Sequence, residues 1–430
     1  MKNKRLRWAV PAATAVAVGT AFAIPALATA SADELPETTP ADLLAAVAQA
    51  EPTAMSGTAV YTARLGLPEL PAEMTGGADP LNLLSGSSTI RVWTDGAERS
   101  RVSLLGTTSE YSAVVDGPEA WTYSSAKNAV VHVSLDDAAT AQLDAAKADA
   151  QARADAVDPA SIPTPEALAE QVLAFASMTS EVTLDDNVVV AGRDAYQLEI
   201  TPLTDDTLVD RIVVAFDGET YVPLSYQAWS SMDTSAPALE VAFTDVSMDA
   251  PSDAALAFST PDGATVEEKV VTGEDLAAAT APAEGTEGDV PVLPEDFDPS
   301  TLDPSALTPG AGFLPEGTSI SGFGWATVVE QSGVDVAGLL SGDVDADAAD
   351  LPASPWAGRP AEDLAEEFRG SAADGGFSLD ATALYDQLTT PVEGGRLFTS
   401  ALLSALVTDD GRVFVGSVPT DTLLAAAGLA

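Results

Sequence analysis

A run of short β-hairpins between Ile90 and Ser134 constrains the fold more than any other part of this chain. The stretch reads IRVWTDGAERSRVSLLGTTSEYSAVVDGPEAWTYSSAKNAVVHVS, in which apolar and polar residues alternate between short turn sequences. Two of the turns contain Asp-Gly, at residues 95–96 and 116–117. Asp-Gly between alternating apolar residues is the strongest short-range signal for an antiparallel hairpin. We therefore expect a β-meander here.

The same alternation returns later in the chain. Short apolar-polar runs resume after residue 178 and continue to residue 270, with a further Asp-Gly turn at residues 217–218. Consecutive hairpins of this kind build antiparallel sheets rather than parallel ones. Together the runs predict an α+β domain with one large curved sheet.

Three helical segments interrupt the strands. Segment 38–52 opens with Thr39 and Pro40, a cap followed by a residue suited to the first helical position, and its apolar residues are three and four apart. Segment 163–178 predicts a second amphipathic helix. Segment 137–157 is alanine-rich with a thin apolar stripe, so we expect a helix that faces solvent or acts as a lid.

Composition divides the chain into four parts. Residues 1–32 form an N-terminal targeting segment, and residues 33–270 form the strand-rich domain. Residues 271–316 are acidic and rich in Pro and Gly, which is typical of a linker. Residues 317–430 contain strand, hairpin and helix patterns that predict a smaller C-terminal α+β domain.

The targeting segment has the features of a secretory signal peptide. Four basic residues precede a long apolar run, and Ala28-Thr29-Ala30 and Ala30-Ser31-Ala32 are both suitable cleavage sites. The alternative is an uncleaved membrane anchor, which Pro11 and Pro25 disfavour. We expect a secreted or cell-envelope protein outside the cytoplasm.

Charge and cysteine content exclude several classes of function. The net charge is −48, and removing residues 1–32 takes away four basic groups and no acid, which leaves −52. Such a protein repels nucleic-acid phosphates and anionic lipid headgroups. The chain has no cysteine, so disulfides, thiol catalysis and thiolate metal sites are excluded.

The remaining polar groups do not assemble a recognisable catalytic set. The single histidine, His132, lies in a strand and is expected to be structural, and acid pairs are too frequent in a chain with 66 acids to be informative. Segment 343–350 has calcium-like Asp spacing, but Ala348 and Ser354 occupy positions that need glycine and a bidentate acid. We expect no enzymatic activity, no cofactor and no metal; an envelope hydrolase that uses paired carboxylates is a minor alternative.

Two arginines stand out because basic residues are scarce. Arg99 and Arg101 are two apart on one strand and so lie on the same face of it. One interpretation is a pair of salt bridges at the rim of the sheet. The other is a polar clamp at the mouth of an apolar cavity.

The order of elements resembles the LolA-like lipoprotein carrier superfamily, in its actinobacterial secreted branch. The resemblance covers residues 38–270 and rests on the segments SGTAVYTARLGL, STIRVWTDGAERSRVSLL, YSAVVDGPEAWTYSSAKNAVVHV, IVVAFDGETYVPLSYQAW and FSTPDGATVEE. It implies an unclosed, strongly curved antiparallel β-barrel with helices plugging its open side. Members of the superfamily hold acyl chains in an apolar interior, whereas the related RseB/MucB-type regulators restrain an anti-sigma factor.

Physical reasoning agrees with an apolar interior. A sheet too long for two modest helices to cover must pack on a second sheet or enclose space, and an enclosed apolar space suits an acyl chain. We expect a non-enzymatic binder or carrier of lipid or lipoprotein acyl chains; the alternative is an envelope-stress module that binds a membrane anti-sigma factor. The residues expected to line one face of the cavity are Val60, Ile90, Val92, Val102, Leu104, Val114, Trp121, Tyr123, Val131, Leu198 and Val213, with Arg99 and Arg101 at its mouth.

Overall fold

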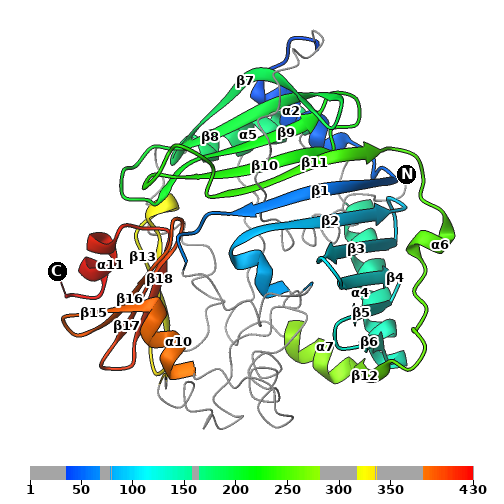
Figure 1. Cartoon of the computed structure of the whole chain (residues 1–430). Helices are drawn as coiled ribbons and strands as arrows, with labels where there is room; N and C mark the ends of the chain where they lie inside the picture. Colours follow the sequence, from blue (N-terminus) through cyan, green and yellow to red (C-terminus); the bar gives the residue numbers. More distant parts are fainter. Residues whose placement is uncertain are drawn as a thin grey trace.

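The computed structural model describes residues 35–67, 78, 80–156, 164–280, 317–334, 336 and 381–429. It contains a twelve-stranded sheet and a separate six-stranded sheet (Figure 1). The predicted signal peptide, the calcium-like segment 343–350 and most of the predicted linker lie outside the described residues. Where that linker was expected to begin, the structure has the end of a strand at Val271 and a helix, α7 (Gly273–Thr280).

The large sheet confirms the predicted α+β fold with a curved, unclosed antiparallel barrel. Its strands follow the order β12-β6-β5-β4-β3-β2-β1-β11-β10-β9-β8-β7, so β12 and β7 stand at opposite ends. All neighbours are antiparallel except β12, which runs parallel to β6. The strands are β1 (Met55–Ala63), β2 (Gly86–Thr94), β3 (Arg99–Leu105), β4 (Glu110–Asp116), β5 (Glu119–Ser124), β6 (Ala129–Leu135), β7 (Ser180–Val190), β8 (Arg193–Pro202), β9 (Val209–Asp217), β10 (Pro223–Ser230), β11 (Leu239–Ser247) and β12 (Thr265–Val271).

Helix α2 (Pro40–Gln49) covers the β7–β9 end of this sheet. The Thr39 hydroxyl accepts a hydrogen bond from the Asp42 amide at 3.2 Å, as the sequence predicts for an N-cap. Leu43 on its buried side is 1% exposed and packs with Leu198 and Phe216. The apolar stripe of α2 is therefore used to cover the sheet.

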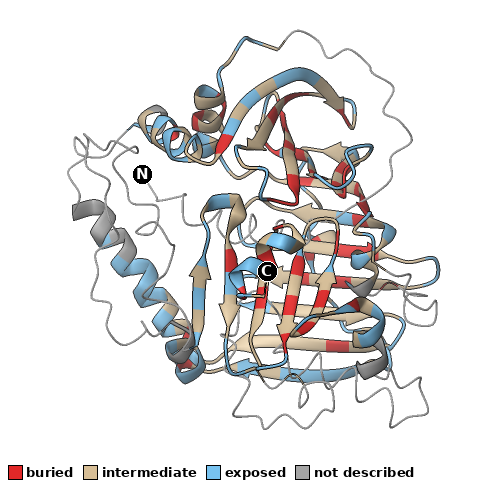
Figure 2. Cartoon of the chain, turned by 90° about the vertical axis from the view of Figure 1, so that its left-hand side faces the viewer, coloured by how far each residue is buried: buried red, intermediate tan, exposed pale blue. Residues whose placement is uncertain are grey.

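The other helices of the large unit differ in how much they bury. Helix α5 (Pro165–Ala176) packs on α2 and on the start of β7. Helix α4 (Asp137–Ala156) is mostly exposed along the part whose side chains are described, apart from Ala139, in agreement with the expected solvent-facing helix. In Figure 2, α4 lies at the lower left and buried residues concentrate on the strands of both sheets. A short 3-10 helix, η2 (Pro80–Leu84), contacts β1 and β2, and α6 (Asp253–Leu256) contacts β2 and β3.

The small sheet has its own apolar core. It follows the order β13-β14-β18-β17-β16-β15, and the buried Val328, Leu406, Phe414 and Leu423 pack together. Its elements are β13 (Thr318–Ser321), η6 (Gly324–Ala326), β14 (Val328–Gln331), α10 (Ala381–Leu388), β15 (Thr389–Val392), β16 (Gly395–Thr399), β17 (Ser404–Thr408), β18 (Val413–Gly416) and α11 (Thr420–Ala426).

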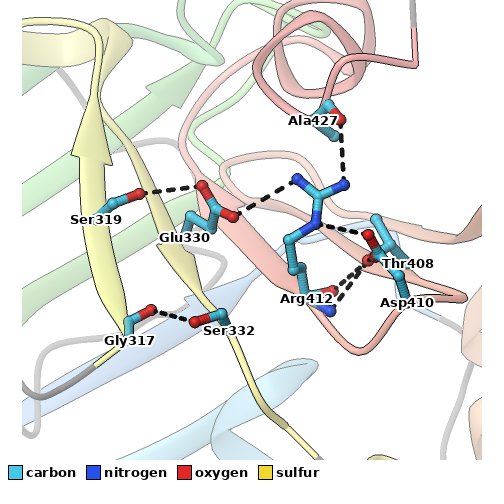
Figure 3. Close-up of polar contacts among 8 residues, drawn as sticks. All are labelled: Gly317, Ser319, Glu330, Ser332, Thr408, Asp410, Arg412 and Ala427. Carbon is cyan, nitrogen blue, oxygen red and sulfur yellow. Dashed lines mark hydrogen bonds and ion pairs between the residues drawn. The ribbon is translucent and has the colours of Figure 1, made fainter.

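Arg412 links three parts of this small unit (Figure 3). Its guanidinium lies 3.5 Å from the Glu330 carboxylate on β14 and 3.0 Å from the Asp410 carboxylate in the β17–β18 turn. It also donates to the Ala427 carbonyl just after α11, at 3.5 Å. A cation at a helix C-terminus is favourable because the last carbonyls carry partial negative charge.

The small unit is hydrogen-bonded to the ends of large-sheet strands. The Ala401 amide donates to the Leu65 carbonyl at 2.8 Å, and the Leu208 amide donates to the Ser417 carbonyl at 2.8 Å. The Trp325 indole donates to the Ser180 hydroxyl at 2.8 Å. The two sheets are therefore joined by specific polar contacts as well as by the chain.

A buried ion pair fixes the β9–β10 turn. The Asp217 carboxylate is 1% exposed and receives two hydrogen bonds from Arg193, at 2.5 and 2.9 Å, and one from the Thr220 amide. Burial acts to raise the pKa of Asp217, but the hydrogen bonds from Arg193 and Thr220 outweigh it and hold the pKa below its ordinary value.

We expect Asp217→Ala to lower the free energy of unfolding by about 3 kcal/mol, because it leaves the Arg193 guanidinium without its buried partner. Because the pKa of Asp217 is lower in the folded than in the unfolded protein, its ionised form stabilises the fold at pH values above the unfolded-state pKa. This stabilisation is lost as the pH falls below about 4. Urea unfolding at pH 7 and pH 3 should therefore show a smaller pH dependence for the variant than for wild type. Asp186→Ala, in an exposed part of β7, is the matched control; an equal loss of stability there would contradict the assignment.

Candidate functional site

Strand register separates the large sheet into two faces. Residues paired across antiparallel strands project to the same side. Tyr61 is opposite Val241, Val241 is opposite Tyr226, Tyr226 is opposite Val214, and Val214 is opposite Leu198. Since Leu198 packs against α2, all of these side chains lie on the side that we call the helix-covered face.

The same face continues onto strands β2 to β6. Ile90 is opposite Leu104, and both pack with Tyr61 in one buried cluster under Leu83 of η2. From there, the ladder Val92, Val102, Ala113, Thr122 and Val131 crosses five strands. Six predicted lining residues therefore share the helix-covered face: Ile90, Val92, Val102, Leu104, Val131 and Leu198.

The other predicted residues lie on the opposite, outer face, so the expectation of one shared face is wrong for them. Arg101 is opposite Val114, Val114 is opposite Trp121, and Trp121 is opposite His132. Alternation along each strand assigns the rest. The outer-face set is Val60, Val114, Trp121, Tyr123, Val213, Arg99 and Arg101. The sequence shows which residues alternate within each strand. It does not show which residues of neighbouring strands project to the same face, because that depends on the number of residues in each turn.

The outer face carries a row of stacked and charged groups. Trp121 stacks on His132 with ring centroids 5.0 Å apart and on Phe258 at 5.6 Å. The His132 ring nitrogen Nδ1 lies 2.6 Å from the Glu268 carboxylate. This environment is consistent with the expected structural role of the histidine.

Both arginines are paired with carboxylates on this face. Arg99 contacts Asp95 at 3.1 Å and Asp253 of α6 at 2.9 Å. Arg101 lies 3.5 Å from Glu110 and has its guanidinium 5.9 Å from the centre of the Trp93 ring. The geometry fits the salt-bridge interpretation of these residues, whereas the helix-covered face is on the other side of the sheet.

Several apolar side chains on elements of the helix-covered side are left exposed, and we call them the uncovered apolar set. Helix α5 has Leu168, Val172 and Phe175 at positions i, i+4 and i+7, with Val172 60% and Phe175 45% exposed. Leu84 of η2 is 43% exposed beside the buried cluster that η2 covers. Three apolar positions on one stripe of a helix that are left partly exposed are unusual, because such a stripe is normally buried.

Tyr226 of β10 also lies partly exposed on the helix-covered face. Its side chain belongs to the helix-covered face and is 36% exposed, yet burial raises its pKa. A phenol that is reachable by solvent and still desolvated lies where the surrounding protein displaces bulk water without covering the ring. Tyr226 and Leu84 were not among the residues predicted from the sequence. The alternation along β10 shows which residues share a face with Tyr226, but only the strand register shows that this face is the helix-covered one.

No metal-binding group of acids and histidine occurs among the described residues. Within the same residues, no helix is both long enough and apolar enough to span a membrane. Besides its apolar side chains, the helix-covered face carries the phenols of Tyr61, which is fully buried, and Tyr226, which is partly exposed.

No protein-family model and no curated protein matches this sequence. Two solved structures illustrate what the fold is similar to. The MucA/MucB complex of Pseudomonas aeruginosa matches 90% of this chain and 96% of that chain at 16% identity, with a TM-score of 0.37. A LolA superfamily protein from Nitrosomonas europaea matches 52% of this chain and 99% of that chain at 11% identity, with a TM-score of 0.19.

Burial disfavours the phenolate of Tyr226 and raises its pKa above the ordinary tyrosine pKa of about 10. We therefore expect Tyr226→Phe to remove one tyrosine that ionises above that value. Absorbance at the phenolate band during an alkaline titration measures this directly. If the phenol lost in the variant titrates at or below the ordinary pKa, Tyr226 is not desolvated as the structure indicates.

Proposed function

We propose that this protein binds an acyl chain of a lipid or lipoprotein outside the cytoplasm and performs no chemistry on it. The observation that carries the proposal is the uncovered apolar set on the helix-covered side, formed by Leu168, Val172 and Phe175 of α5, Leu84 of η2 and Tyr226 of β10. The predicted signal peptide and the resemblance to acyl-chain carriers support the same function.

An aliphatic chain suits this set for a physical reason. Each methylene removed from water contributes about 0.8 kcal/mol, so a long chain is held by contact area alone. The exposed positions are leucine, valine and phenylalanine, which offer no charge to bind. Tyr226 adds one hydroxyl that can hydrogen-bond an ester or carboxyl group near the chain.

The charge of the protein favours a single guest over a membrane surface. With a net charge of −52 after removal of residues 1–32, the protein is repelled by an anionic bilayer. A protein that binds one acyl chain at a time does not need to contact many lipid headgroups. The electrostatics therefore support a soluble carrier or binder of individual lipids.

Binding of a dansylated fatty acid, with displacement by an uncharged monoacylglycerol, tests the proposal. We expect saturable binding by the mature chain, weakened at least about tenfold by Val172→Asp or Phe175→Asp, because a carboxylate in the apolar wall must be desolvated. Met232→Asp is the matched control, since Met232 is as exposed as Val172 but lies in the turn after β10. We expect it to bind like wild type.

A cysteine-free chain gives a second readout. A cysteine introduced by Tyr226→Cys should react with a small maleimide and become protected when the fatty acid is bound, whereas one from Val114→Cys, 1% exposed on the outer face, should react slowly in both states. Absence of binding by wild type, or equal loss in the Met232→Asp control, overturns the proposal. Recovery of a protein partner but no lipid from host material is the result expected for the anti-sigma alternative.

A further inference from the structure

In the part of the chain that the structure describes, strand β12 has no strand neighbour on one side and so forms an edge of the large sheet. Among the described residues its strand partner is β6 alone, and it forms the last position of the sheet, at the lower right in Figure 1. Its side chains are largely exposed, and Val266 and Val270 are 42% and 55% exposed. An edge strand with exposed valines is a template for pairing with a further strand.

The hydrogen bonds to β6 determine which backbone groups point outward. The Thr265 amide donates inward to the Asn128 carbonyl, and the Val271 carbonyl accepts inward from the Asp136 amide. Backbone direction alternates along a strand, so the odd-numbered residues of β12 face β6. The amide and carbonyl groups of Val266, Glu268 and Val270 therefore face away from the sheet.

These three residues can pair with the same three residues of a second copy. In an antiparallel pairing centred on Glu268, Val266 is opposite Val270 of the second copy, and each outward residue is in a position that exchanges two backbone hydrogen bonds. Glu267 is then opposite Lys269 on the other face of the ribbon. Apolar pairs and opposite charges directly across a ribbon are both favourable.

Neighbouring registers lack this match. A shift that centres the pairing on Glu267 places two carboxylates opposite each other, and one centred on Lys269 places two ammonium groups opposite each other. In either shifted register, one of the three outward-facing residues of β12 has no partner within β12 of the second copy and forms no backbone hydrogen bonds across the interface. One register alone thus satisfies the backbone, the valines and the Glu267–Lys269 charges together.

The centre of this register brings two Glu268 side chains together. Each is already held 2.6 Å from His132 of its own chain, and His132 is in turn 3.9 Å from Glu119. The imidazole contact draws each Glu268 carboxylate toward its own sheet. The like-charge contact therefore costs less than it would between two free carboxylates.

We infer that β12 is a self-association surface through which two copies of this chain join their large sheets into one continuous antiparallel ribbon. The contact is isologous, with a two-fold axis at Glu268. Few residues meet, so the interface belongs to the small, weak class, with a dissociation constant on the order of 100 μM. Added salt strengthens the dimer because it screens the repulsion between two strongly acidic chains.

Sedimentation velocity of the mature chain, residues 33–430, tests the inference. Two charge variants are made separately, Lys269→Glu and Glu267→Lys, which place like charges opposite each other in a homodimer. We expect each alone to dimerise about tenfold more weakly than wild type. An equimolar mixture restores the dimer, because the acidic ribbon of one variant then faces the basic ribbon of the other.

A backbone variant tests the same register without charge. The amide of Val270 points outward, so Val270→Pro removes an outward donor and leaves the pairing with β6 intact. We expect it to weaken the dimer with unchanged circular dichroism. A wild-type chain that stays monomeric at about 500 μM in 0.5 M salt, a mixture that stays monomeric, or a proline variant that dimerises like wild type overturns the inference.

Discussion

The pairing register of the twelve-stranded sheet is the constraint on which the rest of this structure depends. Because side chains alternate across a strand, one residue of slippage would exchange the two faces. The buried cluster of Tyr61, Ile90 and Leu104 opposes such a slip, since it would move these side chains out from under η2. The division into a helix-covered face and an outer face follows from that packing, and so does the face on which Tyr226 lies.

Much of the fold could be predicted from the sequence. Asp-Gly at residues 95–96 and 116–117 predicted the β2–β3 and β4–β5 hairpins, and Thr39 with Pro40 marked the start of α2. The number of hairpins predicted one large curved sheet, and the resemblance to the LolA-like superfamily implied that it is unclosed. The parallel pairing of β12 with β6 was not predicted, because it joins segments separated by more than a hundred residues and no local signal specifies it.

The candidate site was predicted less completely. Trp121 and Tyr123 were assigned to the same surface as Val102 because all are apolar and all lie in one meander, but the register places them on opposite sides. The apolar positions of α5 were visible as a helical stripe, whereas their exposure was not, because exposure depends on which neighbours fail to cover them. Tyr226 became a candidate only through the combination of its face, its accessibility and its raised pKa.

The contact between η6 and the end of α5 limits how this protein can be taken apart. Gly324 has a φ of +58°, and a Cβ at this position would lie 2.5 Å from the Thr179 methyl carbon. Only glycine therefore allows the small unit to approach the chain this closely just after α5. The strand ends at Leu65 and Leu208 likewise complete their backbone bonding with residues more than two hundred positions away. The large sheet is therefore not an independent folding unit. If the small unit were removed by truncation, the strand ends at Leu65 and Leu208 would lose their backbone hydrogen-bond partners, and the surface at Thr179 that contacts Gly324 would be uncovered.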